Sequence, residues 1–83
     1  MNGEKFQDLW EGRWQQYRWF PSQSEADMAL CSMLAYWTDS DADQIDRLFR
    51  QSALYRPKWD EPRGATTYGQ LTIQKALESF RRF

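Results

Sequence analysis

The feature that most constrains the fold is an apolar stripe with a helical period between residues 24 and 37. Its members, at i, i+3, i+4, i+7, i+8 and i+11, are Ala26, Ala29, Leu30, Met33, Leu34 and Trp37. This 3.6-residue period predicts an amphipathic helix whose stripe faces a core. Ser24 is the predicted N-cap, and Asp27 stands where a short acidic side chain can reach back to a free amide. We therefore expect a helix that begins at Glu25.

A second helix is predicted directly after this one, from about Ala42 to Gln51. The turn residues 38–41 separate the two helices, and Asp41 is placed to cap the second one. Its inward positions are Ile45, Leu48 and Phe49. Arg47 and Arg50 lie on outward positions near its C-terminal end, where positive charge suits the helix dipole.

Two further helices are predicted at the ends of the chain. Residues 4–11 have apolar side chains at helical spacing and are followed by Gly12, a residue suited to a helix end. The last helix begins near Thr67, which forms a capping box with Gln70, and continues to about Arg82. Gly69 is unfavourable within a helix, which indicates a close approach of backbone or ligand there. No strand alternation and no hairpin signal is evident.

The predicted fold is therefore all-α, a small bundle of about four helices. Residues 1–83 form a single domain, with an irregular aromatic-rich arm at about 12–23 and a core at 24–83. The arm contains Trp14, Tyr17, Trp19 and Phe20. We expect these aromatics to cover the bundle, although a base-stacking platform is the alternative.

The composition excludes several kinds of chemistry. The chain has one Cys and no His, which excludes an internal disulfide and imidazole-dependent catalysis. Cys31, beside the apolar stripe, is expected to be a small packed residue. No long apolar run and no leader pattern is present, so we expect no membrane association and a cytoplasmic location.

Charge is divided unevenly along the chain. Residues 1–46 carry three basic and nine acidic side chains, a net charge of −6, whereas residues 47–83 carry eight basic and three acidic ones, a net charge of +5. The basic half is a candidate for contact with a polyanion. The alternative is that the two halves neutralise each other across helix faces.

The segment 52–63 combines aromatic and basic side chains around a proline. Arg56, Lys58 and Arg63 surround Tyr55 and Trp59, while Pro57 interrupts any helix. Cations neutralise phosphates and aromatic faces stack on bases, so this composition favours binding of single-stranded nucleic acid. Tyr55 and Trp59 could equally be lids on the core.

Catalytic and metal motifs are not evident. The acids Asp39, Asp41, Asp43 and Asp46 resemble the start of a calcium loop, but the required glycine and glutamate are replaced by Gln44 and Arg50. Helix capping accounts for them better. No phosphate-binding glycine loop and no nucleophile with a neighbouring base is present. We expect no catalytic residue and no metal site, and rank last an enzyme that depends on Asp43 and Asp46.

Three ordered stretches carry a family resemblance: S-E-A-D-M-A-L-C-S-M-L-A-Y-W-T, D-Q-I-D-R-L-F-R-Q-S-A-L-Y-R-P-K-W-D and T-Y-G-Q-L-T-I-Q-K-A-L. They resemble the helix-bundle domain beside the primase-polymerase core in replication proteins of phages, plasmids and integrated elements. F-Q-D-L-W-E-G at the front extends the similarity over nearly the whole chain. The matching polar residues are Ser24, Asp27, Asp46, Arg47, Arg50, Ser52, Tyr55, Arg56, Lys58, Trp59, Thr72 and Lys75.

The resemblance implies an accessory module that engages single-stranded template DNA, nucleotide or both, so that a primer can be started. The implied partners are the DNA, the nucleotide, the polymerase core and a helicase domain. No tightly bound cofactor is implied, and ATP with magnesium is a candidate ligand. The candidate binding residues are Arg47, Arg50, Tyr55, Arg56, Lys58, Trp59, Arg63 and Lys75. The alternative is an adaptor that docks on another domain through Trp14 and Trp19.

Overall fold

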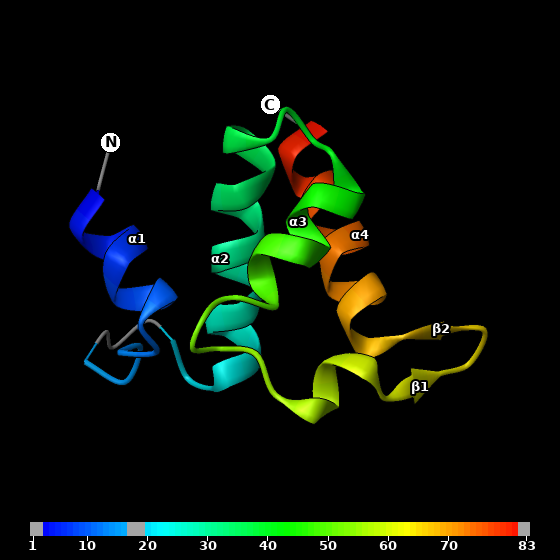
Figure 1. Ribbon diagram of the computed structural model, residues 1–83, viewed down its shortest axis with the longest axis horizontal. Helices are drawn as coiled ribbons and strands as arrows, with labels where there is room; N and C mark the ends of the chain where they lie inside the picture. Colours follow the sequence, from blue (N-terminus) through cyan, green and yellow to red (C-terminus); the bar gives the residue numbers. More distant parts are fainter. Residues whose placement is uncertain (1–2, 17–19, 82–83) are drawn as a thin grey trace.

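A computed structural model describes residues 3–16 and 20–81 of the chain. The elements are α1 (Gly3–Trp10), α2 (Gln23–Trp37), α3 (Ala42–Phe49), the 3₁₀ helix η1 (Pro57–Asp60), β1 (Pro62–Arg63), β2 (Thr66–Thr67) and α4 (Tyr68–Arg81). Figure 1 shows α2, α3 and α4 together, α1 to one side of α2, and the two short strands projecting at the foot of α4. The predicted four-helix fold is confirmed.

The core lies where α2, α3 and α4 meet. The most extensive contact is between α2 and α4, and α3 packs against both. Leu30 and Leu34 of α2, Ile45 and Phe49 of α3, and Ile73 of α4 are almost fully buried. Cys31 is buried as well, and burial raises the pKa of its thiol, so it is a packed residue as expected.

The start of α2 differs from the prediction in two ways. The N-cap is Ser22 and not Ser24, and its side chain makes no capping hydrogen bond. Asp27 does not reach back to a helix-terminal amide, because it lies in the second turn with its side chain completely buried. The inward face of the helix therefore includes Asp27 and Cys31, and it is rotated away from Trp37, which is 60% exposed.

The predicted turn and cap between α2 and α3 are confirmed. Asp39 and Ser40 adopt positive φ angles of 56° and 66° and reverse the chain. Asp41 then caps α3, accepting a hydrogen bond of 3.2 Å from the Gln44 amide. The helix ends at Phe49, two residues before the predicted end, because the Ser52 hydroxyl donates to the Phe49 carbonyl at 2.7 Å and closes the turn.

Helix α1 is fixed to the bundle at its C-terminal end. Gly12 has a φ of +82°, as expected after a helix end, and the Trp10 carbonyl accepts a 2.8 Å hydrogen bond from the Ala53 amide. In the arm, Phe20 is buried and Trp14 packs partly buried against the core, as predicted. Tyr17 and Trp19 lie outside the described residues.

A short β-hairpin between η1 and α4 was not predicted. Pro62 pairs with Thr67 and Arg63 with Thr66, around a two-residue turn whose first residue, Gly64, has a φ of +70°. Strands of two residues are too short to show alternation in a sequence. In the described ranges, no helix is long and apolar enough to cross a membrane.

Candidate nucleic-acid interface

Three cations converge on the ring of Tyr68, the first residue of α4. Lys58 Nζ lies 4.7 Å from the ring centroid, and the guanidinium carbons of Arg63 and Arg56 lie 5.7 and 5.8 Å from it. These distances are within the range of cation–π attraction. We call Arg56, Lys58, Arg63 and Tyr68 the Tyr68 cluster.

Local chain geometry explains why the Tyr68 cluster forms. Pro57 is at the first position of η1, where its fixed φ suits a helix start. The hairpin turn at Gly64 then folds the chain back, and the Tyr68 amide donates to the Glu61 carbonyl at 2.9 Å. Residues that are up to 12 positions apart in the sequence therefore surround one ring.

Asp27 lies directly beneath the Tyr68 cluster. The Tyr68 hydroxyl donates to its Oδ2 at 2.6 Å, and Arg56 Nη1 lies 3.2 Å from Oδ1 and 3.0 Å from Oδ2. Burial raises the pKa of Asp27, and this shift is opposed by the hydrogen bond from Tyr68 and by the charge of Arg56. Burial and the hydrogen bond to Asp27 raise the pKa of Tyr68, against a hydrogen bond with Ser24.

The Tyr68 cluster keeps unused hydrogen-bond donors. Arg56 uses Nη1 for Asp27 and the Leu54 carbonyl, and its Nε and Nη2 have no partner among residues 3–16 and 20–81. In the same ranges Lys58 forms no direct ion pair, although its positive charge acts to lower the pKa of Asp27. Arg63 is bound to the neighbouring Glu61 at 3.3 Å on the exposed surface, where such a pair is weak. The cluster can therefore offer several donors to an anion.

Arg50 and Tyr55, two other predicted site residues, belong to a separate network. Arg50 donates to Asp46 at 2.9 Å and to both oxygens of Asp60 at 3.1 and 2.6 Å. The Tyr55 hydroxyl donates to Asp60 at 3.0 Å, and the Arg50 guanidinium lies over the Tyr55 ring. The hydrogen bonds that Arg50 donates to Asp60 and Asp46 raise the pKa of Arg50. The hydrogen bonds that Asp60 accepts from Arg50 and Tyr55 lower the pKa of Asp60. All three nitrogens of the Arg50 guanidinium are thus already engaged.

Trp59 has no free face for a base. It is 1% exposed, stacks on Phe49 with ring centroids 3.7 Å apart, and donates from Nε1 to Asp46 at 2.8 Å. A Cβ on Gly69 would lie only 2.4 Å from the indole, so Gly69 permits the close approach of Trp59. Of the two roles considered for Trp59, the structure supports the lid on the core.

Arg47 and Lys75 are exposed, on α3 and α4. Lys75 follows Tyr68 by seven residues, which places it on the same side of α4, about 10 Å along the axis. In the part of the chain that the structure describes, Arg47 makes no ion pair or ring contact with the Tyr68 cluster. Among the described residues, no three His, Cys, Asp or Glu side chains gather as a metal site would require.

Two residues of the site were missed as site residues. Tyr68 was not considered, and Asp27 was interpreted as part of a cap. A signal for Asp27 was present, because it lies three, four and seven residues before Leu30, Cys31 and Leu34, on their face of the helix. A carboxylate on a buried face needs a partner, and the nearby cations of residues 56–63 could supply it.

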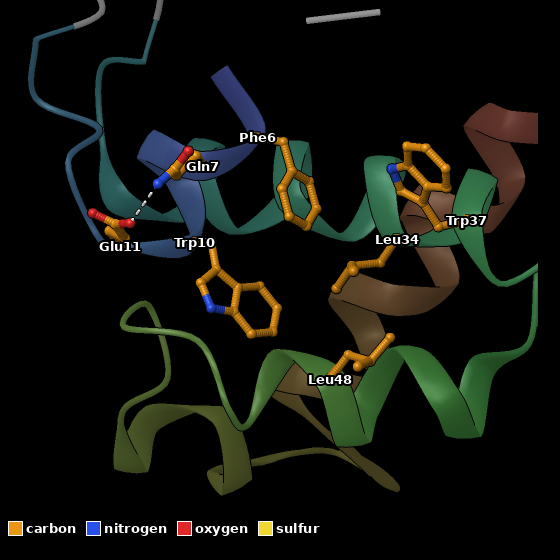
Figure 2. Close-up of a pocket in the computed structure, with 7 residues that line it drawn as sticks. All are labelled: Phe6, Gln7, Trp10, Glu11, Leu34, Trp37 and Leu48. Atoms are coloured by element: carbon orange, nitrogen blue, oxygen red, sulfur yellow. Dashed lines mark hydrogen bonds between the residues drawn. The ribbon is translucent and has the colours of Figure 1, made fainter. Parts of the chain in front are cut away.

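A separate apolar groove of about 580 Å³ opens between α1, α2 and α3. Figure 2 shows Phe6 and Trp10 of α1 facing Leu34 and Leu48, with Trp37 at one end and the hydrogen-bonded pair Gln7 and Glu11 at the other. Phe6 and Trp10 stack on each other with centroids 5.9 Å apart. The groove and the Tyr68 cluster share no residue.

Comparison with known proteins places this architecture in a family. A model of the NrS-1 polymerase HBD domain matches residues 23–83, from the first residue of α2 to the end of the chain. The chain belongs to the NrS-1 polymerase HBD family. The matched range contains Asp27 and every residue of the Tyr68 cluster, whereas α1 lies outside it.

A curated relative of this HBD domain is a DNA primase-polymerase of Nitratiruptor phage NrS-1. It is 46% identical over 55 residues, which cover 66% of this chain but only 8% of the phage protein. The expected relation to a primase-polymerase helix-bundle domain is therefore confirmed. The HBD domain corresponds to a small part of a much longer replication protein.

Proposed function

We propose that this HBD domain is a non-catalytic module of a primase-polymerase that binds single-stranded template DNA, nucleotide or both during primer initiation. One observation carries the proposal: three cations surround the Tyr68 ring, and Lys58 has no carboxylate partner within the described residues. A cation without an ion-pair partner, flanked by two arginines beside an aromatic ring, suits a phosphate chain and its bases. ATP with magnesium is the nucleotide ligand we would test first.

The structure supports some of the proposed binding residues more strongly than others. Arg56, Lys58 and Arg63 form the phosphate site, and Lys75 extends it along α4. Arg47 is exposed but stands apart, and Arg50 is engaged by Asp46 and Asp60. Tyr55 belongs to the Arg50 network, whereas Tyr68 has three cations around its ring, so Tyr68 replaces Tyr55 and Trp59 as the proposed aromatic contact.

Fluorescence anisotropy with a labelled single-stranded oligonucleotide, with and without ATP and magnesium, tests the proposal. Lys58→Ala should weaken binding about tenfold while the thermal midpoint stays close to that of the wild type. Lys5→Ala is a matched control, because Lys5 also lies over an aromatic ring, that of Phe20, but on α1. Equal binding by the Lys58→Ala and wild-type domains would refute the assigned site.

The second candidate function is docking on the polymerase core of the replication protein. The predicted docking residues were Trp14 and Trp19, but Trp14 packs against the bundle and Trp19 is outside the described residues. The apolar groove, with the exposed Trp37 at its end, is the observation that favours docking. Trp37→Ser should weaken capture of a separately purified polymerase core. Gln74→Ser is the control, because Gln74 is exposed on α4 and does not line the groove.

A further inference from the structure

The completely buried carboxylate of Asp27 lies beneath the cations of the Tyr68 cluster. Asp27 is 0% exposed, and its negative charge opposes the binding of any anion to the cations above it. Burial of an ionised carboxylate is also unfavourable unless it is paired and hydrogen-bonded. Its presence therefore requires a role that outweighs both effects.

The contacts of Asp27 define such a role. The carboxylate accepts hydrogen bonds from one nitrogen of the Arg56 guanidinium, Nη1, and from the hydroxyl of Tyr68. These two residues come from different segments, the residue before η1 and the first turn of α4, and the Asp27 carboxylate bonds to both. With Nη1 held, the other edge of the guanidinium, Nε and Nη2, is the one without a partner in the described part of the chain. That edge has the parallel donors that bind phosphate oxygens in a bidentate manner.

We infer that Asp27 is a positioning residue that orients Arg56 and Tyr68 for binding the phosphate groups of single-stranded DNA or nucleotide. The inference rests on the proposed function of the Tyr68 cluster. Asp27 does not touch the ligand; it fixes the two side chains that do, so that less side-chain freedom is lost on binding.

Substitution of Asp27 by Asn distinguishes positioning from simple electrostatics, because the two predict opposite changes in oligonucleotide affinity. Asp27→Asn removes a negative charge next to the anion site, so a purely electrostatic effect would strengthen binding. Loss of positioning would instead weaken it, by roughly tenfold if one charged hydrogen bond is lost. Asp43→Asn is the matched control, since it removes an exposed carboxylate of α3 that is outside the cluster.

The experiment measures oligonucleotide affinity and the Arg56 Nε–H signal by NMR for the wild type, Asp27→Asn, Asp43→Asn and Tyr68→Phe. Weaker binding and a broadened Arg56 signal in folded Asp27→Asn, with no loss in Asp43→Asn, are the expected results. Equal or tighter binding by folded Asp27→Asn would overturn the inference. If Asp27→Asn does not fold, Tyr68→Phe decides: it keeps the ring but removes the hydroxyl that bonds to Asp27, so weaker binding supports positioning of Tyr68 by Asp27 and unchanged binding overturns it. Absence of binding by the wild type would refute the proposed function itself.

Discussion

The indole of Trp59 lies against the backbone of Gly69, so close that a Cβ at this position would be 2.4 Å from the ring. The contact joins η1 to the first turn of α4, and Phe49 stacks on the indole. It keeps Lys58 and Tyr68, the sequence neighbours of Trp59 and Gly69, side by side. The Tyr68 cluster thus depends on a glycine that a helix would otherwise disfavour.

Gly69→Ala should destabilise the domain by about 2 kcal/mol, because the added methyl group overpacks the buried indole. This figure is the net loss, because the gain in helix propensity, about 1 kcal/mol, offsets only part of the cost of overpacking. Thermal and urea unfolding measure the change. Gln74→Ala, at an exposed position of the same helix, should be nearly neutral. A Gly69→Ala domain as stable as the wild type would show that the contact is looser than described.

Arg50→Ala should change oligonucleotide affinity by less than about twofold, since its charge is taken up by Asp46 and Asp60. Arg56→Ala should weaken binding about tenfold, because that guanidinium has an unused edge. Titrations of both variants under the same conditions compare the two predictions. Equal losses would mean that the ligand opens the Arg50 network on binding.

Salt should weaken binding in proportion to the number of phosphates contacted. For a single strand, each neutralised phosphate contributes about 0.7 to the slope of log affinity against log salt concentration. Lys58→Ala should therefore reduce this slope by about 0.7, while Lys5→Ala should leave it unchanged. A slope that is the same in wild type and Lys58→Ala would place Lys58 away from the phosphates.

Two carboxylates should titrate on opposite sides of the ordinary aspartate pKa of 3.8. The pKa of Asp60 is lowered by hydrogen bonds from Arg50 and Tyr55, so its contribution to stability is present above the unfolded pKa and lost as the pH falls through the folded one. The pKa of Asp27 is raised by burial. Its ionisation therefore disfavours the fold, and the stability gained below the unfolded pKa is lost as the pH rises through the folded one.

Carbon-13 NMR of the side-chain carboxylates, followed from acid to neutral pH, measures both pKa values directly. The Asp27 midpoint should lie above 3.8 and the Asp60 midpoint below it. A midpoint for Asp27 below 3.8 would show that Arg56 and Tyr68 outweigh its burial.

The helices were predictable because their information is local. The cap at Asp41, the helix end at Gly12 and the cap at Thr67 each depend on residues within one turn, and all three are present, although of the predicted Thr67–Gln70 capping box only the bond to the Thr67 hydroxyl is formed among the described residues. The Thr67 hydroxyl accepts from the Gln70 amide at 3.2 Å. The cap of α2 was placed two residues late, since Ser22 and Ser24 are equally good candidates in the sequence.

The site was less predictable because it depends on contacts between distant residues. The concentration of cations in residues 56–63 was visible, but their common partner Tyr68 is brought to them by a hairpin too short to recognise. Trp59 and Tyr68 are both aromatic and both lie near cations in the sequence. Only packing distinguishes them, since Trp59 is fully buried in the core whereas Tyr68 is partly buried, with the three cations beside its ring.

The most direct test of the central claim is an NMR titration of the isotopically labelled domain with a short single-stranded oligonucleotide, at low and moderate salt and with or without ATP and magnesium. We predict shifts concentrated on residues 56–68 and on Lys75, with smaller ones at Asp27, that decrease as salt is added. Shifts confined to the groove residues Phe6, Trp10 and Trp37, or no shifts in a folded domain, would contradict the assignment of the Tyr68 cluster as the nucleic-acid interface.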